Sequence, residues 1–306
     1  MNEIIDMLPE SIKEHLMNLH PASIERIEEI RIRILKRVEV IIMGKPIFLP
    51  YITTYEDSMT LLNEVSHYSI YTMEEELKRG FITINGGHRV GLSGRVITEN
   101  GQVKAIRDVT SFNIRVAREK IGIAEAYVPY LYNKKWLNTL LVGPPQTGKT
   151  TLLRDFARLI STGYRTIESK KVGIVDERSE IAGCVRGVAQ HQLGERVDVL
   201  DACPKAEGMM MMIRSMSPDV LIVDEIGRID DTEAILEAVH AGVQLFVTVH
   251  GYTAEELIKR PSLQPLIKLK VFDRFIELSR KNGPGTVHQI IDREGNTLLN
   301  ERSVTT

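Results

Sequence analysis

The chain has 306 residues, of which 43% are hydrophobic and 26% charged, and its formal net charge at pH 7 is −2. This composition is typical of a globular protein, and the length suggests two domains that each bury a core. The near-neutral charge gives no general attraction for nucleic acid, and no apolar run is long enough for a membrane-spanning helix.

Residues 1–118 alternate between helix-like and strand-like patterns, and we expect them to form a smaller α+β domain. Apolar spacing typical of helices covers residues 7–19, 23–30, 55–68 and 69–79. Strand-like segments cover residues 30–34, 38–42, 47–49, 81–84, 88–94, 95–97 and 103–106. Asn100-Gly101 predicts a tight hairpin turn between the last two of these segments.

Arginines are the feature of this first domain that bears on function. An arginine that reaches the γ-phosphate bound by a neighbouring subunit would stabilise charge in the transition state. Salt bridges and solvated strand edges are the alternative for each of them. The candidates are Arg89, Arg95, Arg107, Arg115 and Arg118.

The second domain, residues 119–306, carries a phosphate-binding motif after an expected linker helix over residues 119–133. A short apolar strand over residues 139–142 runs into a glycine-bounded loop, and a helical pattern follows. The loop has the spacing Gly-x-x-x-x-Gly-Lys-Thr, which is that of the P-loop in its proper strand–loop–helix context. The nucleotide-binding residues are therefore expected to be Gly143, Pro144, Pro145, Gln146, Thr147, Gly148, Lys149, Thr150 and Thr151.

The chemistry of the motif explains its residue types. Backbone N–H groups and the positive end of the following helix cradle phosphate oxygens. Gly148 lets the main chain approach the phosphates, and Lys149 can reach their β and γ oxygens. Thr150 can offer its hydroxyl to Mg²⁺. The sequence therefore predicts that the protein binds a nucleoside triphosphate, with ATP and Mg²⁺ as the expected pair.

Two later strands end in acidic residues, where α/β sheets place their ligands. The strand over residues 218–223 leads to Asp224 and Glu225, which fit a Walker B motif. Asp224 would hold the Mg²⁺ coordination shell, and Glu225 would polarise the attacking water as general base. The strand over residues 171–175 leads to the charged run Asp176-Glu177-Arg178-Ser179-Glu180. Its acids can position Mg²⁺ or water and Arg178 can pair with a phosphate, although a charged surface loop is the alternative.

A third strand, residues 243–249, ends in His250, which can sense the γ-phosphate or bridge to Glu225. A purely structural histidine is the alternative. Residues 230–233, Asp-Asp-Thr-Glu, are expected to give an N-cap and an acidic first turn to the helix over residues 234–241, which precedes this strand. Residues 183–198 are rich in glycine and polar residues and are expected to form a mobile loop.

The remaining segments carry no expected chemistry. Met209 to Met212 begin a helix and are expected to pack in the core. Cys184 and Cys203 lack metal-ligand spacing and are expected to be free thiols in a reducing cytoplasm. Two further strands, residues 272–278 and 286–298, are joined by a turn at Asn282-Gly-Pro-Gly285, to which the sequence assigns no functional role.

The order of these motifs resembles the type II/type IV secretion ATPase family. The resemblance is carried by the P-loop, the acidic box at residues 175–178, the Walker B strand at residues 221–227 and the histidine box at residues 248–251. It implies a RecA-like P-loop NTPase domain, preceded by the smaller α+β domain, in a homo-oligomer that is usually a hexameric ring. The catalytic residues it implies are Lys149, Glu225, Glu177, Arg178 and His250, with Thr150 and Asp224 at the metal.

Within that family, the amino-acid sequence of residues 203–218 resembles that of a sporulation branch found in endospore-forming bacteria. That resemblance implies an ATPase at the cytoplasmic face of the inner mother-cell membrane, held there by membrane channel proteins that connect mother cell and forespore. Two other functions remain open: a RecA-like ATPase that translocates nucleic acid, and a nucleotide-gated scaffold with little turnover. The single tryptophan and the net charge do not favour a stable nucleic-acid partner, and Glu225 favours hydrolysis over a pure switch.

Overall fold

The computed structural model describes residues 1–66, 74–281 and 283–300. The chain divides into two compact units, residues 1–118 and 119–306. In the part of the chain that the structure describes, no helix is both long and apolar enough to cross a membrane.

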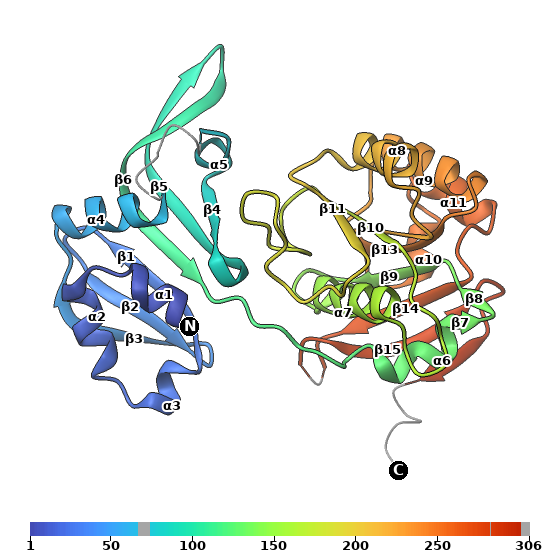
Figure 1. The fold of residues 1–306 in the computed structure, drawn as a ribbon, viewed down its shortest axis with the longest axis horizontal. Coiled ribbons are helices and arrows are strands. Elements are labelled where there is room, and N and C mark those ends of the chain that lie inside the picture. The colour runs from blue at the N-terminus through green and yellow to red at the C-terminus, as the bar shows by residue number, and fades with distance from the viewer. Residues whose placement is uncertain (67–73, 282, 301–306) are drawn as a thin grey trace. The chain divides into compact units, whose positions relative to one another are not determined.

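The first unit is built on a six-stranded antiparallel sheet with the strand order β3-β2-β1-β6-β5-β4 (Figure 1). Its helices pack on one face of that sheet, where Ile12, Leu61 and Leu77 join buried strand residues such as Val40 and Ile114 in one apolar core. The strands are β1 Ile27–Arg33, β2 Arg37–Ile42, β3 Lys45–Ile52, β4 Phe81–Ile84, β5 His88–Glu99 and β6 Gln102–Arg115. The helices are α1 Asn2–Met7, α2 Glu10–Met17, α3 Pro21–Ile24, α4 Tyr55–Val65 and α5 Glu74–Arg79.

The hairpin predicted at Asn100-Gly101 is confirmed. Both residues have positive φ, 52° for Asn100 and 77° for Gly101, and they join β5 to β6. Positive φ at both central positions is what a type I′ turn requires, and this turn matches the twist of the paired strands. The two long strands therefore run as one continuous hairpin, where the sequence suggested shorter pieces.

The helix expected over residues 23–30 is wrong after Ile24, because the chain enters β1 at Ile27. A bulge between Ile27 and Glu29 shifts the register of β1 against β2. The bulge leaves Ile27 and Ile30 buried on the same side although they are three residues apart, which is a spacing that imitates a helix. The expected helix over residues 7–19 begins only at Glu10, because Pro9 separates α2 from α1.

The other two helices expected in this unit are shorter than their patterns suggested. The helix expected over residues 55–68 ends at Val65, and the one expected over residues 69–79 is described from Glu74 onwards. Residues 67–73, which both expectations include, lie outside the described residues.

Three candidate arginines of this unit have structural partners within it, and one of them, Arg115, has its Nε 3.9 Å from Oε1 of Glu29. Arg118 donates from Nη2 to the carbonyls of Glu25 at 2.6 Å and Ile27 at 2.9 Å, so it ties the end of the unit to the start of β1. The guanidinium of Arg89 lies over the ring of Phe81, 3.4 Å from its centroid, which is a cation–π contact.

The second unit is built on an eight-stranded sheet with the order β11-β10-β12-β13-β9-β14-β15-β16. The first six strands in that order are parallel, and β15 and β16 continue the sheet antiparallel. Its strands are β9 Thr139–Gly143, β10 Val172–Asp176, β11 Val197–Asp201, β12 Val220–Val223, β13 Gln244–His250, β14 Arg274–Ser279, β15 Thr286–Asp292 and β16 Thr297–Asn300. A small ribbon of β7 Tyr132–Asn133 and β8 Lys135–Trp136 precedes them.

Helices cover both faces of this sheet (Figure 1). On one face, Phe156 of α7 packs against Phe246 and other buried strand residues. On the other face, Met209 of α8 and Ile235 of α9 pack against strand residues that include Leu245. The helices are α6 Val128–Leu131, α7 Lys149–Thr162, α8 Lys205–Met216, α9 Ile229–His240, α10 Ala254–Leu257 and α11 Gln264–Lys268. With both faces buried, the central strands β9, β12 and β13 are runs of buried, mainly apolar residues, as expected for parallel strands.

Three expectations in this unit need correction. The linker helix over residues 119–133 is reduced to a 3₁₀ turn and the four residues of α6. The loop over residues 183–198 runs into an additional strand, β11, and buries Cys184 and His191. The helix α9 begins at Ile229, five residues earlier than expected, with Arg228 in the cap position; the predicted acidic first turn is confirmed by Asp230 and Asp231.

Candidate nucleotide-binding site

The P-loop leaves the sheet at the carboxyl end of β9, whose five residues are all buried. Gly143 has no room for a side chain, because a Cβ there would lie 2.6 Å from Oγ1 of Thr147. That hydroxyl donates to the carbonyl of Pro144 at 2.8 Å and closes the loop on itself. Gln146 and Gly148 have φ of 61° and 87°. These left-handed residues turn the chain directly into α7.

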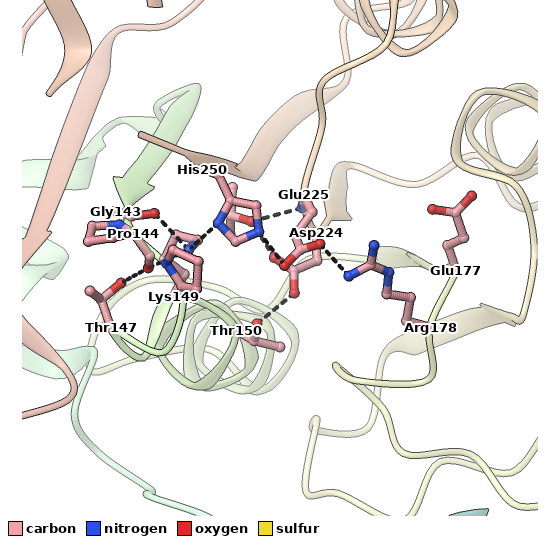
Figure 2. Close-up of polar contacts among 12 residues, drawn as sticks. Gly143, Pro144, Thr147, Lys149, Thr150, Glu177, Arg178, Asp224, Glu225 and His250 are labelled. Atoms are coloured by element: carbon pink, nitrogen blue, oxygen red, sulfur yellow. Dashed lines mark hydrogen bonds and ion pairs between the residues drawn. The ribbon is translucent and has the colours of Figure 1, made fainter. Parts of the chain in front are cut away.

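Lys149 is buried within this loop, with 5% of its surface exposed. Its Nζ donates to the carbonyls of Gly143 at 2.8 Å and Pro144 at 3.0 Å, and it lies 3.2 Å from Nδ1 of His250 (Figure 2). Burial lowers the pKa of Lys149, and the nearby charges of Asp224 and Glu225 act in the opposite direction. The ammonium group is thus folded back onto the loop carbonyls, at the place where a phosphate would compete for it.

Asp224 follows the buried strand β12 and meets the start of α7. Its Oδ2 accepts a hydrogen bond from Oγ1 of Thr150 at 2.6 Å, and its Oδ1 accepts one from the hydroxyl of Thr248 on β13. Burial raises the pKa of Asp224, while the hydrogen bonds from both hydroxyls oppose that rise. A threonine hydroxyl beside a carboxylate supplies the hard oxygen ligands that Mg²⁺ prefers.

Glu225 stands in an unusual backbone conformation, with φ of 54°. Such a φ is uncommon for a residue with a side chain and often marks a functional position. Thr248 holds it there, because its Oγ1 accepts the N–H of Glu225 at 2.9 Å. Thr248 therefore positions both acids of the Walker B pair, a role that the sequence did not assign to it. Its position two residues before His250, on the neighbouring strand, was the available signal.

The carboxylate of Glu225 is held from two sides (Figure 2). His250 Nε2 lies 2.7 Å from Oε1, and Arg178 Nη1 donates to Oε2 at 2.8 Å. With Lys149 as a donor, Nδ1 of His250 accepts and its Nε2–H donates to Glu225. The structure therefore joins four predicted residues in one chain of contacts: Lys149, His250, Glu225 and Arg178.

Glu177 and Asp176 of the charged run have other partners. The Glu177 carboxylate pairs with Lys205 at the start of α8, and in Figure 2 Arg178 lies between it and Glu225. Asp176 is buried and accepts backbone N–H bonds from residues 180, 181 and 182, each at 2.9 Å. Burial raises the pKa of Asp176 to about 6. Asp176 thus holds the loop that presents Arg178.

The turn between β14 and β15 was expected to have no function, yet it contacts the P-loop. Arg280 donates to the carbonyl of Pro145 and, at 3.0 Å, to Oε1 of Gln146. Gly285 N–H donates to the carbonyl of Thr147 at 2.7 Å. A cavity of about 530 Å³ opens beside this contact. Asn282, which the predicted turn included, lies outside the described residues. The sequence showed only a glycine-rich turn and gave no sign of its target.

We expect Arg280→Ala to weaken nucleotide binding about three- to tenfold, because the P-loop loses the two hydrogen bonds that hold Pro145 and Gln146 in place. Titration of a fluorescent ATP analogue measures the change. Arg293→Ala is a matched control, since the Arg293 side chain is 51% exposed and pairs with Asp273 and Glu294. Equal affinities for both variants would show that the contact does not help to shape the site.

Comparison with known proteins places the chain in a family. It matches the family "Sporulation stage III, protein AA" over residues 1–298. It is 61% identical over its full length, and over the full length of the relative, to Stage III sporulation protein AA of Bacillus subtilis (strain 168). Its fold is similar to that of the Legionella pneumophila ATPase DotB, with a TM-score of 0.60, 14% identity, and coverage of 87% of this chain and 77% of DotB.

A second similar structure is that of the pilus retraction motor PilT with bound ADP. The TM-score is 0.59 at 19% identity, over 83% of this chain and 75% of PilT. These likenesses confirm the expected fold, a RecA-like P-loop domain preceded by a smaller α+β domain.

Proposed function

Because the chain belongs to the family of sporulation stage III protein AA, we propose that it is a Mg²⁺-dependent ATPase that works as a homo-oligomeric, hexameric ring. The observation that carries the proposal is the convergence of three strand ends on one site. The P-loop follows β9, the Walker B acids follow β12 and His250 ends β13, and their side chains are joined by hydrogen bonds. The similarity to DotB and PilT supports the same reading.

The residues present fit a nucleoside triphosphate. The first N–H groups of a helix have no acceptor within it and carry its positive partial charge. In this chain α7 begins at Lys149 and turns those groups toward the P-loop. The Lys149 ammonium lies among them and would exchange its contacts with the Gly143 and Pro144 carbonyls for contacts with phosphate oxygens. PilT was solved with ADP, which is consistent with a nucleotide in this position.

The residues also fit Mg²⁺ that arrives with the nucleotide. No group of three or more His, Cys, Asp or Glu side chains suited to a metal occurs within residues 1–66, 74–281 and 283–300. Mg²⁺ ordinarily keeps several waters and binds through one or two protein oxygens plus substrate phosphates. Thr150 and Asp224, with their oxygens 2.6 Å apart, would hold it in that manner. Bound there, Mg²⁺ would neutralise negative charge on the phosphates.

Glu225 is the group that we assign as general base. It would accept a proton from the attacking water and orient it toward the γ-phosphorus. In the isolated chain both carboxylate oxygens are already engaged, by Arg178 and His250. These contacts hold the carboxylate in place and occupy acceptor sites that the attacking water would use, so we expect hydrolysis to be slow until a neighbour or partner opens one of them. His250 contacts both Lys149 and Glu225, so it can relay phosphate binding to the base.

The location and partners that we propose come from the family. The ring would act at the cytoplasmic face of the inner mother-cell membrane, held by membrane channel proteins between mother cell and forespore. A nucleotide-gated scaffold with little turnover is the second candidate, and the engaged state of Glu225 is the observation that favours it. A nucleic-acid translocase has no comparable support.

Hydrolysis of ATP at increasing protein concentration tests the proposal. We expect the rate per chain to rise with concentration and to require Mg²⁺, because shared sites form only in the assembled ring. Analytical ultracentrifugation with ATP would follow assembly in parallel. Intact ATP binding with negligible hydrolysis at every concentration would instead favour the scaffold.

A further inference from the structure

Two helices on one face of the ATPase unit, α8 and α9, border a groove of about 800 Å³. Met210 and Met211 of α8 line it, and Met211 is 52% exposed. The neighbouring Met209 and Met212 are buried in the core instead. The expectation that these methionines all pack inside is therefore only half correct. Exposed methionines are unbranched and polarisable, and they form surfaces that adapt to the apolar side of a helix.

The border of this groove is strongly acidic. Glu207, Asp230, Glu233 and Glu237 line it, with Arg214 as the single basic lining residue. In the part of the chain that the structure describes, none of these four carboxylates forms an ion pair. The three acids on α9 are spaced three and four residues apart, so they form one row along the groove. Apolar side chains beside an uncompensated acidic row are complementary to a helix with an apolar stripe and basic flanks.

Both walls of the groove connect to the nucleotide site. Lys205, the first residue of α8, pairs with Glu177, the neighbour of Arg178 in sequence. The other helix, α9, begins four residues after Glu225. Asp231 accepts the N–H groups of Gly227 and Arg228, each at 2.9 Å, and so makes the segment between Glu225 and α9 rigid. A change in the separation of α8 and α9 would thus act on both partners of the Arg178–Glu225 pair.

We propose that this groove docks a basic amphipathic helix of a partner protein, and that docking opens the Arg178–Glu225 pair. The second part rests on the proposed function, whereas the first does not. The twelve residues of α8 span about 18 Å, which suits about three turns of a docked helix. Lysines or arginines along its flanks would pair with Glu207, Glu233 and Glu237 while its apolar stripe covers Met211.

A second copy of this chain does not supply that occupant. Among the described helices of eight or more residues, α2, α4 and α9 carry no excess of basic residues, and α8, which has Lys205 and Arg214 against Glu207, is itself a wall of the groove. The helix α7 has an excess of basic residues, but its apolar side is buried against the sheet. The arginines of the first unit lie largely on β-strands, which present a flat surface and do not fill a groove.

A designed helix is a suitable probe. Methionines and a row of acidic residues would bind any helix that has an apolar stripe and basic flanks, whatever its exact sequence. The probe is a labelled peptide of about 18 residues with leucines at positions i, i+3, i+4 and i+7 and lysines on the flanks. We expect it to bind the full-length protein without nucleotide, as measured by fluorescence anisotropy. We also expect it to shift the methyl NMR signals of Met210 and Met211 while leaving those of Met209 and Met212 nearly unchanged.

Matched variants separate the groove from general charge. Glu233→Lys with Glu237→Lys should weaken binding at least about tenfold. Glu168→Lys with Glu195→Lys changes the same charge at exposed residues outside the groove and should weaken it less than about threefold. A glutamate version of the peptide should bind at least about tenfold more weakly than the lysine version.

Three results would overturn docking of a basic helix. They are no binding of the lysine peptide, equal loss in both double variants, and groove-dependent self-association of the chain in sedimentation without peptide. The effect on turnover is measured separately, as stimulation of ATP hydrolysis by the peptide. Binding without stimulation would remove only the proposed coupling, and binding in a protein without ATPase activity would leave the docking site standing.

Discussion

Glu225→Gln should lower the turnover number for ATP hydrolysis by about 10²- to 10⁴-fold, which is the usual contribution of a general base. The amide cannot accept the proton of the attacking water, but it occupies nearly the same volume. It also keeps one oxygen to accept a hydrogen bond from Arg178 or His250, the present partners of the carboxylate. We therefore expect ATP affinity to change by less than about fivefold. Steady-state hydrolysis and titration of a fluorescent ATP analogue measure the two quantities independently.

Glu195→Gln is the matched control for this change, since Glu195 lies exposed in a loop that has no contact with the candidate base. It should retain the turnover of the unaltered protein. If Glu225→Gln hydrolyses ATP within about threefold of the unaltered protein, Glu225 is not the base and the network around it has another purpose. If both proteins bind ATP and neither hydrolyses it, the scaffold becomes the better interpretation.

How far the sequence could predict this molecule depends on whether a signal is local. The P-loop is a local sequence motif. The acids and the histidine of the site stand at the ends of apolar strands that are buried on both faces, and such runs can also be recognised from neighbouring residues alone. The parallel sheet then brings Lys149, Asp224 and His250 together, since the carboxyl ends of β9, β12 and β13 lie side by side. That is why the principal residues of the candidate site could be predicted without coordinates.

The features that were missed depend on contacts between distant parts of the chain. Arg280 meets Pro145 across 135 positions of sequence, and no local pattern predicts that pair. Thr248 looked like part of an apolar strand, although its hydroxyl bonds the two residues that directly follow the neighbouring strand β12. The β1 bulge placed Ile27 and Ile30 on one side of a strand at helical spacing. In each case tertiary contact, rather than residue preference, decided the outcome.

Lys149→Ala should have the second large effect, on binding of the triphosphate itself. The Lys149 ammonium is the charged donor buried in the P-loop, where it now serves two carbonyls. A hydrogen bond to a charged group contributes about 1.5–3 kcal/mol, and two such bonds to phosphate oxygens would be lost. We therefore expect ATP affinity to fall at least about a hundredfold, as measured by isothermal titration calorimetry with Mg²⁺ present.

Lys281→Ala is the matched control. It removes one positive charge from an exposed residue beside Arg280, on the turn that contacts the P-loop, and so shows how much of the effect of Lys149→Ala comes from the lost charge alone. Its affinity for ATP should stay within about threefold of the unaltered protein. Loss of binding in Lys149→Ala with an unchanged melting temperature would place the effect at the phosphates. ATP affinity of Lys149→Ala within about fivefold of the unaltered protein would mean that the loop backbone binds the nucleotide without this side chain. Lys149 would then keep its contacts with Gly143, Pro144 and His250 when nucleotide is bound.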